Sequence, residues 1–181
     1  AHRIHNETGL HRHRVSIPSV AIADFASRVF ERFDDKHVLV IGAGEMAAET
    51  LRYLKDAGAT QIHVVNRSPD HALEVANQWG GVAVPWERLW EELTAADLVI
   101  GATGAGEVIV KADQFARVVA PQRQQQAMFI LDLAVPRNFE PAVGDELGVY
   151  LYSLDDLAAA CEQNRQARAA ELPAAEEIIL A

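Results

Sequence analysis

Residues 38–47 read Val-Leu-Val-Ile-Gly-Ala-Gly-Glu-Met-Ala, an apolar run followed at once by a G-x-G-x-x-A pattern. The apolar run has the length of a strand that is buried on both faces. Gly42 permits a tight turn out of that strand, Gly44 leaves room for a pyrophosphate, and Ala47 lets a following helix pack against the sheet. The first amides of such a helix bind phosphate groups. The stretch therefore predicts a strand, a phosphate-binding turn and a helix.

The chain on both sides of this stretch alternates between two kinds of apolar periodicity. Six short apolar runs have strand length: Val38–Ile41, Ile62–Val65, Val82–Val84, Leu98–Ile100, Met128–Leu131 and Val149–Leu151. Four stretches between them have helical spacing: Met46–Lys55, Ala72–Trp79, Trp86–Leu93 and Lys111–Val119. Strands that alternate with helices are typical of a doubly wound, mostly parallel α/β sheet. With the glycine pattern, this predicts a Rossmann fold.

Both ends of the chain are predicted to be helical and lie outside the alternation. Pro18 suits a first helical turn. An apolar stripe follows it: Ile22, Phe25, Ala26, Val29 and Phe33. Ser153 and Asp156 have the spacing of a capping box, and Pro173 is expected to kink or interrupt the helix that they start. This last helix either runs out of the domain or folds back on it.

We therefore expect three parts in the chain. Residues 1–33 form a linker and a helix, residues 34–152 form the nucleotide-binding domain, and residues 153–181 form the C-terminal helix. A length of 181 residues suits one such domain with additional helix.

The composition disfavours several classes of function. With 16 basic and 26 acidic residues the formal net charge is −10, which disfavours binding of nucleic acid by the domain as a whole. A single cysteine excludes an internal disulfide framework and suits the cytoplasm. No apolar run reaches the roughly 20 residues of a membrane helix. The early histidines, His2, His5, His11 and His13, have no cysteine or acidic partner at ligand spacing, so no metal site is expected.

The end of the second predicted strand indicates the type of cofactor. An NAD site usually carries an acidic residue there, which binds the ribose 2′-hydroxyl. This chain has Asn66, Arg67 and Ser68 instead. Arg67 can pair with a 2′-phosphate and stack on adenine, while Asn66 and Ser68 can donate hydrogen bonds. NADP is favoured over NAD, although Asn66 and Ser68 can also form a turn and cap the next helix.

Two further strand ends complete the predicted site. The fourth strand ends in a glycine-rich segment, residues 101–106, where Thr103 can hydrogen-bond the nicotinamide half or the segment can be a simple turn. The fifth ends in Asp132 and a Val-Pro pair that can line the same pocket. Arg137 can bind a substrate carboxylate or form a surface ion pair. The predicted cofactor-binding residues are Gly42, Ala43, Gly44, Glu45, Met46, Ala47, Asn66, Arg67, Ser68, Thr103, Gly104 and Val135.

No residue is a convincing catalyst of proton transfer or covalent chemistry. Cys161 falls on the apolar face of the predicted C-terminal helix and is interpreted as a packing residue. Most histidines lie in the basic start of the chain, His37 precedes a strand and His63 lies within one. The cofactor domain is therefore expected to work with a catalytic part elsewhere.

Several motifs, taken in order, resemble the central NADP-binding domain of the glutamyl-tRNA reductase family over essentially the whole chain. They are Asn6–Gly9, Val15–Val20, Val38–Met46, Asn66–Ser68, Ala102–Ala105, Asp132–Arg137, Tyr152–Leu157, Asn164–Arg165, Arg168, Glu171 and Glu176–Ile179. Ala47 stands where the family often has glycine, and Pro173 is unexpected in the family's long helix. The last motifs resemble the start of the helix that leads to the family's dimerisation domain.

The resemblance implies a mechanism and partners. In the family a cysteine of an N-terminal domain attacks glutamyl-tRNA to form a thioester, and NADPH reduces it to glutamate-1-semialdehyde in tetrapyrrole biosynthesis. That domain is not expected within this chain, so most tRNA contacts and the homodimer interface would be made elsewhere, and an aminomutase would receive the product. Two alternatives stay open: a shikimate-dehydrogenase-like NADP oxidoreductase, which needs a substrate domain with a lysine, and a non-enzymatic NADP sensor.

Overall fold

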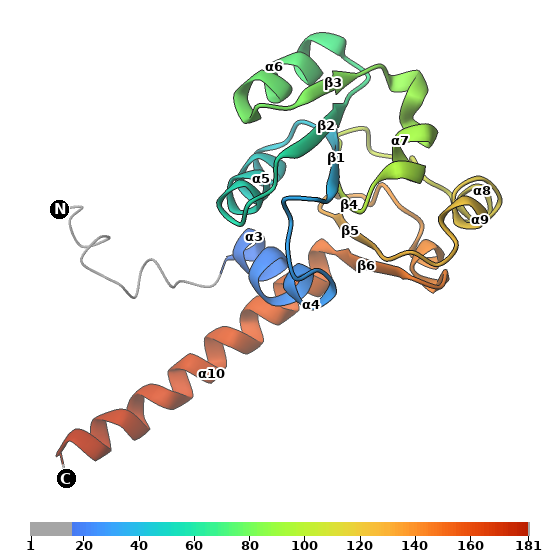
Figure 1. The fold of residues 1–181 in the computed structure, drawn as a ribbon. Helices are drawn as coiled ribbons and strands as arrows, with labels where there is room; N and C mark the ends of the chain where they lie inside the picture. Colours follow the sequence, from blue (N-terminus) through green and yellow to red (C-terminus); the bar gives the residue numbers. More distant parts are fainter. Residues whose placement is uncertain (1–15, 181) are drawn as a thin grey trace.

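The computed structural model describes residues 16–180, with side chains described as far as residue 171, and contains one six-stranded parallel sheet. The strand order is β3-β2-β1-β4-β5-β6 (Figure 1). The strands are β1 (His37–Gly42), β2 (Gln61–Val65), β3 (Val82–Val84), β4 (Leu98–Ala102), β5 (Met128–Asp132) and β6 (Val149–Ser153). All six predicted strands are present, and the doubly wound α/β fold is confirmed.

Helices cover both faces of the sheet because alternate residues of each buried strand point to opposite faces. On one face, α5 (Glu45–Asp56) and α6 (Pro69–Trp79) share a core with Val38 and Val40 of β1. On the other, α7 (Leu89–Ala95) and α8 (Ala112–Val118) share a core with Leu39 and Ile41. The remaining short elements are α9 (Ala120–Arg123), η2 (Trp86–Arg88) and η3 (Pro141–Asp145). The helix expected over 86–93 is therefore split into η2 and α7.

The predicted N-terminal helix is present but is wider in its middle than the sequence indicated. It consists of α3 (Ile17–Ser19), η1 (Val20–Ala26) and α4 (Ser27–Val29), of which η1 is a π-helix. The amide of Ser27 donates to the carbonyl of Ile22, five residues back. Pro18 lies in the first turn, as predicted, and Ile22 and Ala26 are buried against the sheet. A pattern of apolar residues does not distinguish such a local widening from a regular helix.

Helix α10 (Leu154–Leu180) runs away from the sheet rather than folding back on it (Figure 1). Its first part packs against α3 and η1, where Asn164 Nδ2 donates to Asp24 Oδ2 at 3.0 Å. Of the two effects predicted for Pro173, interruption is wrong, because the helix is continuous through that position, and a kink stays a prediction. A proline removes one backbone donor, and the neighbouring turns of a long helix retain their own bonds. No helix among residues 16–180 is long and apolar enough to cross a membrane.

The centre of the sheet is the point at which the strand order reverses. β1 pairs with β2 on one side and with β4 on the other, and Gly42 lies beside Ala102 in the β1–β4 register. In open parallel sheets ligands bind beyond the carboxyl ends of the strands at such a point. The glycine turn after β1 and the glycine-rich segment after β4 are therefore neighbours at the expected place.

Candidate functional site

The backbone requires glycine at only one of the two glycine positions in the turn after β1. Gly42 has φ +103°, and a Cβ built on it would lie 2.6 Å from the carbonyl oxygen of Ala102. The fold therefore requires glycine at this position. Gly44 has φ −74°, and a Cβ there would meet the same oxygen at 3.4 Å, an ordinary contact. The surroundings of Gly44 therefore accept a Cβ, and the fold does not require glycine there as it does at position 42.

Helix α5 has no side-chain cap at its N-terminus, so no side chain accepts a hydrogen bond from its first amides. Gly44 is the N-cap and offers no side chain, and the first bond of the helix runs from the amide of Ala48 to the carbonyl of Gly44. The uncapped amides and the positive end of the helix dipole suit an anion. Ala47 is 1% exposed and packs in the core, so its role is close helix–sheet packing. Glu45 lies exposed in the first turn, and Met46 is half-buried.

The side chains of Asn66 and Ser68 are used locally. Asn66 Oδ1 accepts from the amide of Ser68 at 3.0 Å, and Ser68 Oγ accepts from the amide of His71 at 3.4 Å. These bonds form a turn and cap α6, as the alternative interpretation predicted. Asn66 still lines the hollow described below, whereas Ser68 does not.

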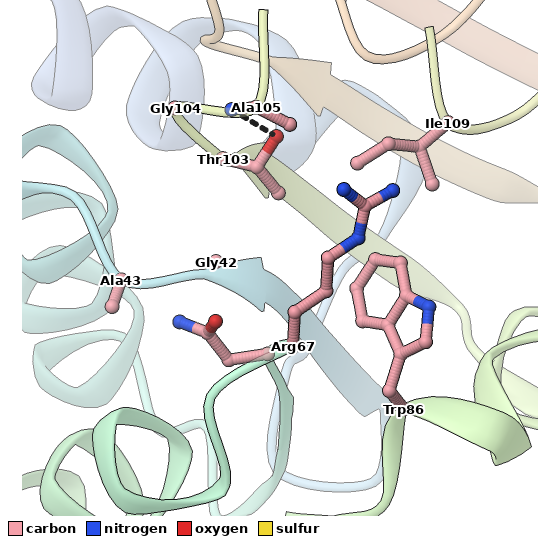
Figure 2. A pocket seen from close by; sticks show the side chains of 9 residues that line it. Gly42, Ala43, Arg67, Trp86, Thr103, Gly104, Ala105 and Ile109 are labelled. Carbon is pink, nitrogen blue, oxygen red and sulfur yellow. Dashed lines mark hydrogen bonds between the residues drawn. The ribbon is translucent and has the colours of Figure 1, made fainter. Parts of the chain in front are cut away.

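Arg67 extends over the carboxyl edge of the sheet next to two groups that hold it. Its guanidinium lies 5.0 Å from the centroid of the Trp86 ring, in cation–π geometry, and one nitrogen is 3.0 Å from Glu107 Oε1. Figure 2 shows the Arg67 side chain alongside Trp86. Both members of the Arg67–Glu107 pair are more than half exposed, so this pair is weak and exchangeable. The arginine is thus pre-positioned but available to an anion.

A hollow of about 190 Å³ opens between the exits of β1, β2 and β4 (Figure 2). Half of the predicted cofactor-binding residues line it: Gly42, Ala43, Asn66, Arg67, Thr103 and Gly104. Three residues that the sequence analysis missed complete it: Trp86, Ala105 and Ile109. A second hollow, of about 260 Å³, adjoins it at Asn66, Arg67 and Trp86. Trp86 follows the third strand after Pro85, so the strand-end rule would have found it, whereas no pattern marks Ile109.

Thr103 is fixed by a residue that the sequence analysis also missed. Asn138 is fully buried, its Nδ2 donates to Thr103 Oγ1 at 2.6 Å, and its Oδ1 accepts from the amide of Thr103 at 3.1 Å. Its carbonyl also accepts from the amides of Ile109 and Val110. Asn138 therefore ties both ends of the segment after β4 to the loop after β5. Its separation of 35 residues from Thr103 left no local signal.

The side chains of Asp132 and Arg137 bind groups at the end of β5 and in the loop that follows it. Asp132 is fully buried and accepts from the amides of Ala134, Asn138 and Phe139. Arg137 Nε lies 3.7 Å from Asp132 Oδ2, so Arg137 does form an ion pair, but with a fully buried carboxylate and not at the surface as predicted. Asp132 does not line the hollow, and neither does Val135, which is 78% exposed. A contact of Val135 with cofactor stays a prediction.

The hollow holds no side chain suited to proton transfer near neutral pH or to covalent catalysis, since its lining contains no cysteine, histidine, lysine or carboxylate. Cys161 lies half-buried on α10. Burial raises the pKa of its thiol, and the carboxylate of Asp24 raises that pKa further. A thiol with a raised pKa is a poor nucleophile. This supports the expectation that Cys161 is not a nucleophile, while its half-buried position differs from the fully packed one that was predicted.

Histidines of two strands meet away from this hollow. His37 Nε2 and His63 Nδ1 lie 3.3 Å and 2.7 Å from the same oxygen, Glu92 Oε1. The sequence analysis treated both histidines as isolated and expected no metal site. The three residues are 26 and 29 positions apart, so only the pairing of β1 with β2 and the packing of α7 reveal the cluster.

Comparison with known proteins gives consistent matches. A family model described as shikimate / quinate 5-dehydrogenase matches residues 24–160. A glutamyl-tRNA reductase of Rhodopirellula baltica is 50% identical over 99% of this chain and 42% of its own length. The structure of the glutamyl-tRNA reductase of Methanopyrus kandleri is 32% identical with a TM-score of 0.82, covering 98% of this chain and 44% of that one.

One smaller solved structure is a single domain of about the same extent as this chain. The nucleotide-binding domain of the glutamyl-tRNA reductase of Thermoplasma volcanium matches with a TM-score of 0.65 and 22% identity, covering 85% of this chain and 96% of that one. At this identity the match shows the fold. The chain spans about two fifths of the length of the curated relatives that it matches.

Proposed function

The chain belongs to the shikimate / quinate 5-dehydrogenase family, and from this premise and its similarity to glutamyl-tRNA reductases we propose that it is the NADPH-binding domain of such a reductase. The observation that most supports this proposal is the glycine at position 44. The fold leaves room for a side chain there, yet the position has none and the first turn of α5 is uncapped. A pyrophosphate that approaches the backbone closely explains both features.

The residues around this turn fit the rest of the cofactor. The amides of α5 bind the pyrophosphate, and Arg67 pairs with the 2′-phosphate after releasing Glu107. The lining of the first hollow contains no carboxylate that would repel that phosphate, whereas Glu87 lines the adjoining hollow at the end of β2. Thr103, oriented by Asn138, hydrogen-bonds the nicotinamide half. Bound there, NADPH would supply a hydride to the carbonyl carbon of a glutamyl thioester; the C–S bond would break, the cysteine thiolate would leave, and glutamate-1-semialdehyde and NADP would result.

Other steps of the proposed reaction belong to other parts of such a reductase. The thioester requires a nucleophilic cysteine, and Cys161 is half-buried on α10 with a raised pKa. The net charge of −10 disfavours strong RNA binding by this chain. We therefore expect the cysteine, most contacts with glutamyl-tRNA and the dimer interface to come from further domains of the reductase, with transfer of the aldehyde to an aminomutase in the cytoplasm.

Calorimetric titration with NADPH and with NADH tests the cofactor assignment. NADPH is expected to bind more tightly than NADH. Arg67→Ala should weaken NADPH binding at least tenfold and NADH binding less than threefold, because charge-assisted hydrogen bonds contribute about 1.5–3 kcal/mol. Arg88→Ala is the matched control, since Arg88 is also exposed and paired with a glutamate but lies outside the hollow. Equal affinity for both cofactors, or equal loss in both variants, would contradict the role of Arg67.

A second assay separates the reductase from the alternative that the family model favours. A shikimate dehydrogenase reading predicts NADPH formation when shikimate and NADP are added to the chain, whereas our proposal predicts none. We also expect no turnover of glutamyl-tRNA by the 181-residue chain alone. Turnover in either assay would overturn the proposal that this chain supplies the cofactor site only.

A further inference from the structure

A histidine pair and a buried glutamate form a cluster that the cofactor site does not use. His37 is the first residue of β1, His63 is the middle residue of β2, and Glu92 lies in α7. His63 pairs in register with Leu39, which is two residues after His37, so both histidines face the same side of the sheet. That side is covered by α7. The cluster thus joins two strands and a helix.

The donor atoms of the cluster have metal-ligand spacing. One nitrogen of each histidine and one oxygen of Glu92 all lie within 4.8 Å of one another. Four-coordinate zinc with nitrogen and oxygen ligands at about 2.0–2.1 Å places neighbouring ligand atoms about 3.3 Å apart. The distance from His37 Nε2 to Glu92 Oε1 is already 3.3 Å. The 2.7 Å contact of His63 Nδ1 with the same oxygen would lengthen by about 0.6 Å on metal binding, and the two histidine nitrogens, within 4.8 Å of each other, would draw together.

The charge of Glu92 is the second observation that points to a cation. Its side chain is 8% exposed, and among the described residues its ion-pair partners are His37 and His63. No lysine or arginine among the described residues pairs with Glu92, and a buried carboxylate is stabilised by the positive charge of a cation bound beside it. A divalent ion supplies that charge and accepts both imidazoles as ligands. The side chains of His37 and His63 are 19% and 29% exposed, so the cluster lies at the border of the core and not deep within it.

The other charged groups near His37 are already engaged. Asp97 Oδ2 accepts from the backbone amide of His37 at 2.9 Å, and Asp97 Oδ1 lies 3.6 Å from Arg123. Because Asp97 already pairs with Arg123 and accepts from the amide at the start of β1, we do not expect it to be a fourth ligand. Three protein ligands with water at the fourth position are the expected coordination.

We propose that His37, His63 and Glu92 bind Zn²⁺ and that the ion links α7 to β1 and β2. Imidazole nitrogen with one carboxylate oxygen is a donor set that zinc accepts and that calcium and magnesium, which prefer oxygen ligands, do not. The ion binds the folded chain and therefore stabilises it. It is independent of the nucleotide site, because none of the three residues lines that hollow.

Thermal unfolding of the chelator-treated full chain, titrated with ZnCl₂, tests the proposal. At a free zinc concentration 100 times the Kd, the unfolding equilibrium constant should fall about 100-fold. His63→Asn and Glu92→Gln should abolish this shift. Glu92→Gln retains hydrogen-bonding capacity and so separates loss of the metal from loss of the fold. His71→Asn is the matched control, since His71 is exposed on α6, and it should keep the full shift.

Cobalt substitution provides a readout of coordination. Co²⁺ added to the metal-free chain should give the intense visible absorption of a four-coordinate site in the wild type and in His71→Asn, but not in Glu92→Gln. Histidines near the start of the sequence are present in every variant, so binding by them cancels in the comparison. An equal zinc shift in wild type and Glu92→Gln, or no shift in either, would overturn the proposal.

Discussion

Helices α5 and α10 each follow a strand of the same parallel sheet, but they begin in opposite ways. At the start of α10, Ser153 Oγ accepts from the amide of Asp156 at 3.2 Å, and Asp156 Oδ2 accepts from the amide of Ser153 at 2.9 Å. At the start of α5, Gly44 provides no acceptor. The chain supplies its own cap where the helix has only to be stable. It leaves the amides available at the switch point of the sheet, where an anionic ligand fits.

The largest expected effect is the loss of stability in Gly42→Ala. It tests whether the glycine at this position serves the fold, in contrast to Gly44, which we assign to the ligand. Gly42→Ala places a Cβ 2.6 Å from a backbone oxygen at φ +103°. We expect a loss of about 3 kcal/mol or more in the free energy of unfolding, seen as a fall of at least about 6 °C in Tm.

The control for this substitution is Gly104→Ala, because a Cβ at Gly104 meets nothing within 4 Å. That variant should unfold within about 1 °C of the wild type. If both variants unfold alike, steric demand does not explain the glycine at position 42.

Gly44→Ser tests the comparison directly by giving α5 the kind of cap that α10 has. The backbone at φ −74° accepts serine, and its hydroxyl can accept from the first-turn amides. Stability should be unchanged or slightly raised, while NADPH affinity should fall about tenfold or more because the side chain competes with the pyrophosphate. Calorimetric titration and thermal unfolding measure the two effects. Unchanged affinity would show that the open N-terminus of α5 is not the phosphate site.

Ser153→Ala is the reciprocal change and should affect stability alone. Removing an N-cap side chain costs about 1 kcal/mol, which corresponds to about 2–4 °C in Tm for a chain of this size. NADPH affinity should stay within twofold of the wild type, because α10 starts at the edge strand β6, away from the hollow. A matching loss of affinity would mean that the two helix ends are coupled.

The sequence predicted the fold well because its signals are local. All six strands are short apolar runs in the sequence, although only the central strands are buried on both faces and the edge strands β3 and β6 are partly exposed. The glycine turn and the capping box are also fixed by spacing within a few residues. The path of α10 through Pro173 was missed, since local propensity overstated the effect of one proline in a long helix.

The parts of the site that escaped prediction depend on contacts between distant segments. Asn138 orients Thr103 across 35 residues, and Glu92 meets His37 and His63 only after α7 packs on the sheet. Arg67 was identified from its strand end, but its pairing with Glu107 was not. A single sequence carries no local trace of such pairs, whereas the register of the sheet and the packing of the helices determine them.

The smallest effect is expected for Glu45→Gln. This variant compares the two helix starts by the charge of their acidic residues and not by their caps. Glu45 is an exposed acid at the first position of α5, and Asp155 is an exposed acid at the second position of α10, also within the first turn. An acid near a helix N-terminus stabilises it by about 0.3–1 kcal/mol, so Glu45→Gln and Asp155→Asn should each lower stability by a similar, small amount. Only Glu45 lies on the helix end that we propose for the pyrophosphate, so Glu45→Gln alone should raise NADPH affinity, about two- to threefold at low salt. The gain should shrink as ionic strength rises, because exposed charges are screened. If Asp155→Asn raises the affinity equally, the effect reflects the net charge of −10 and not the position of the acid at the open end of α5.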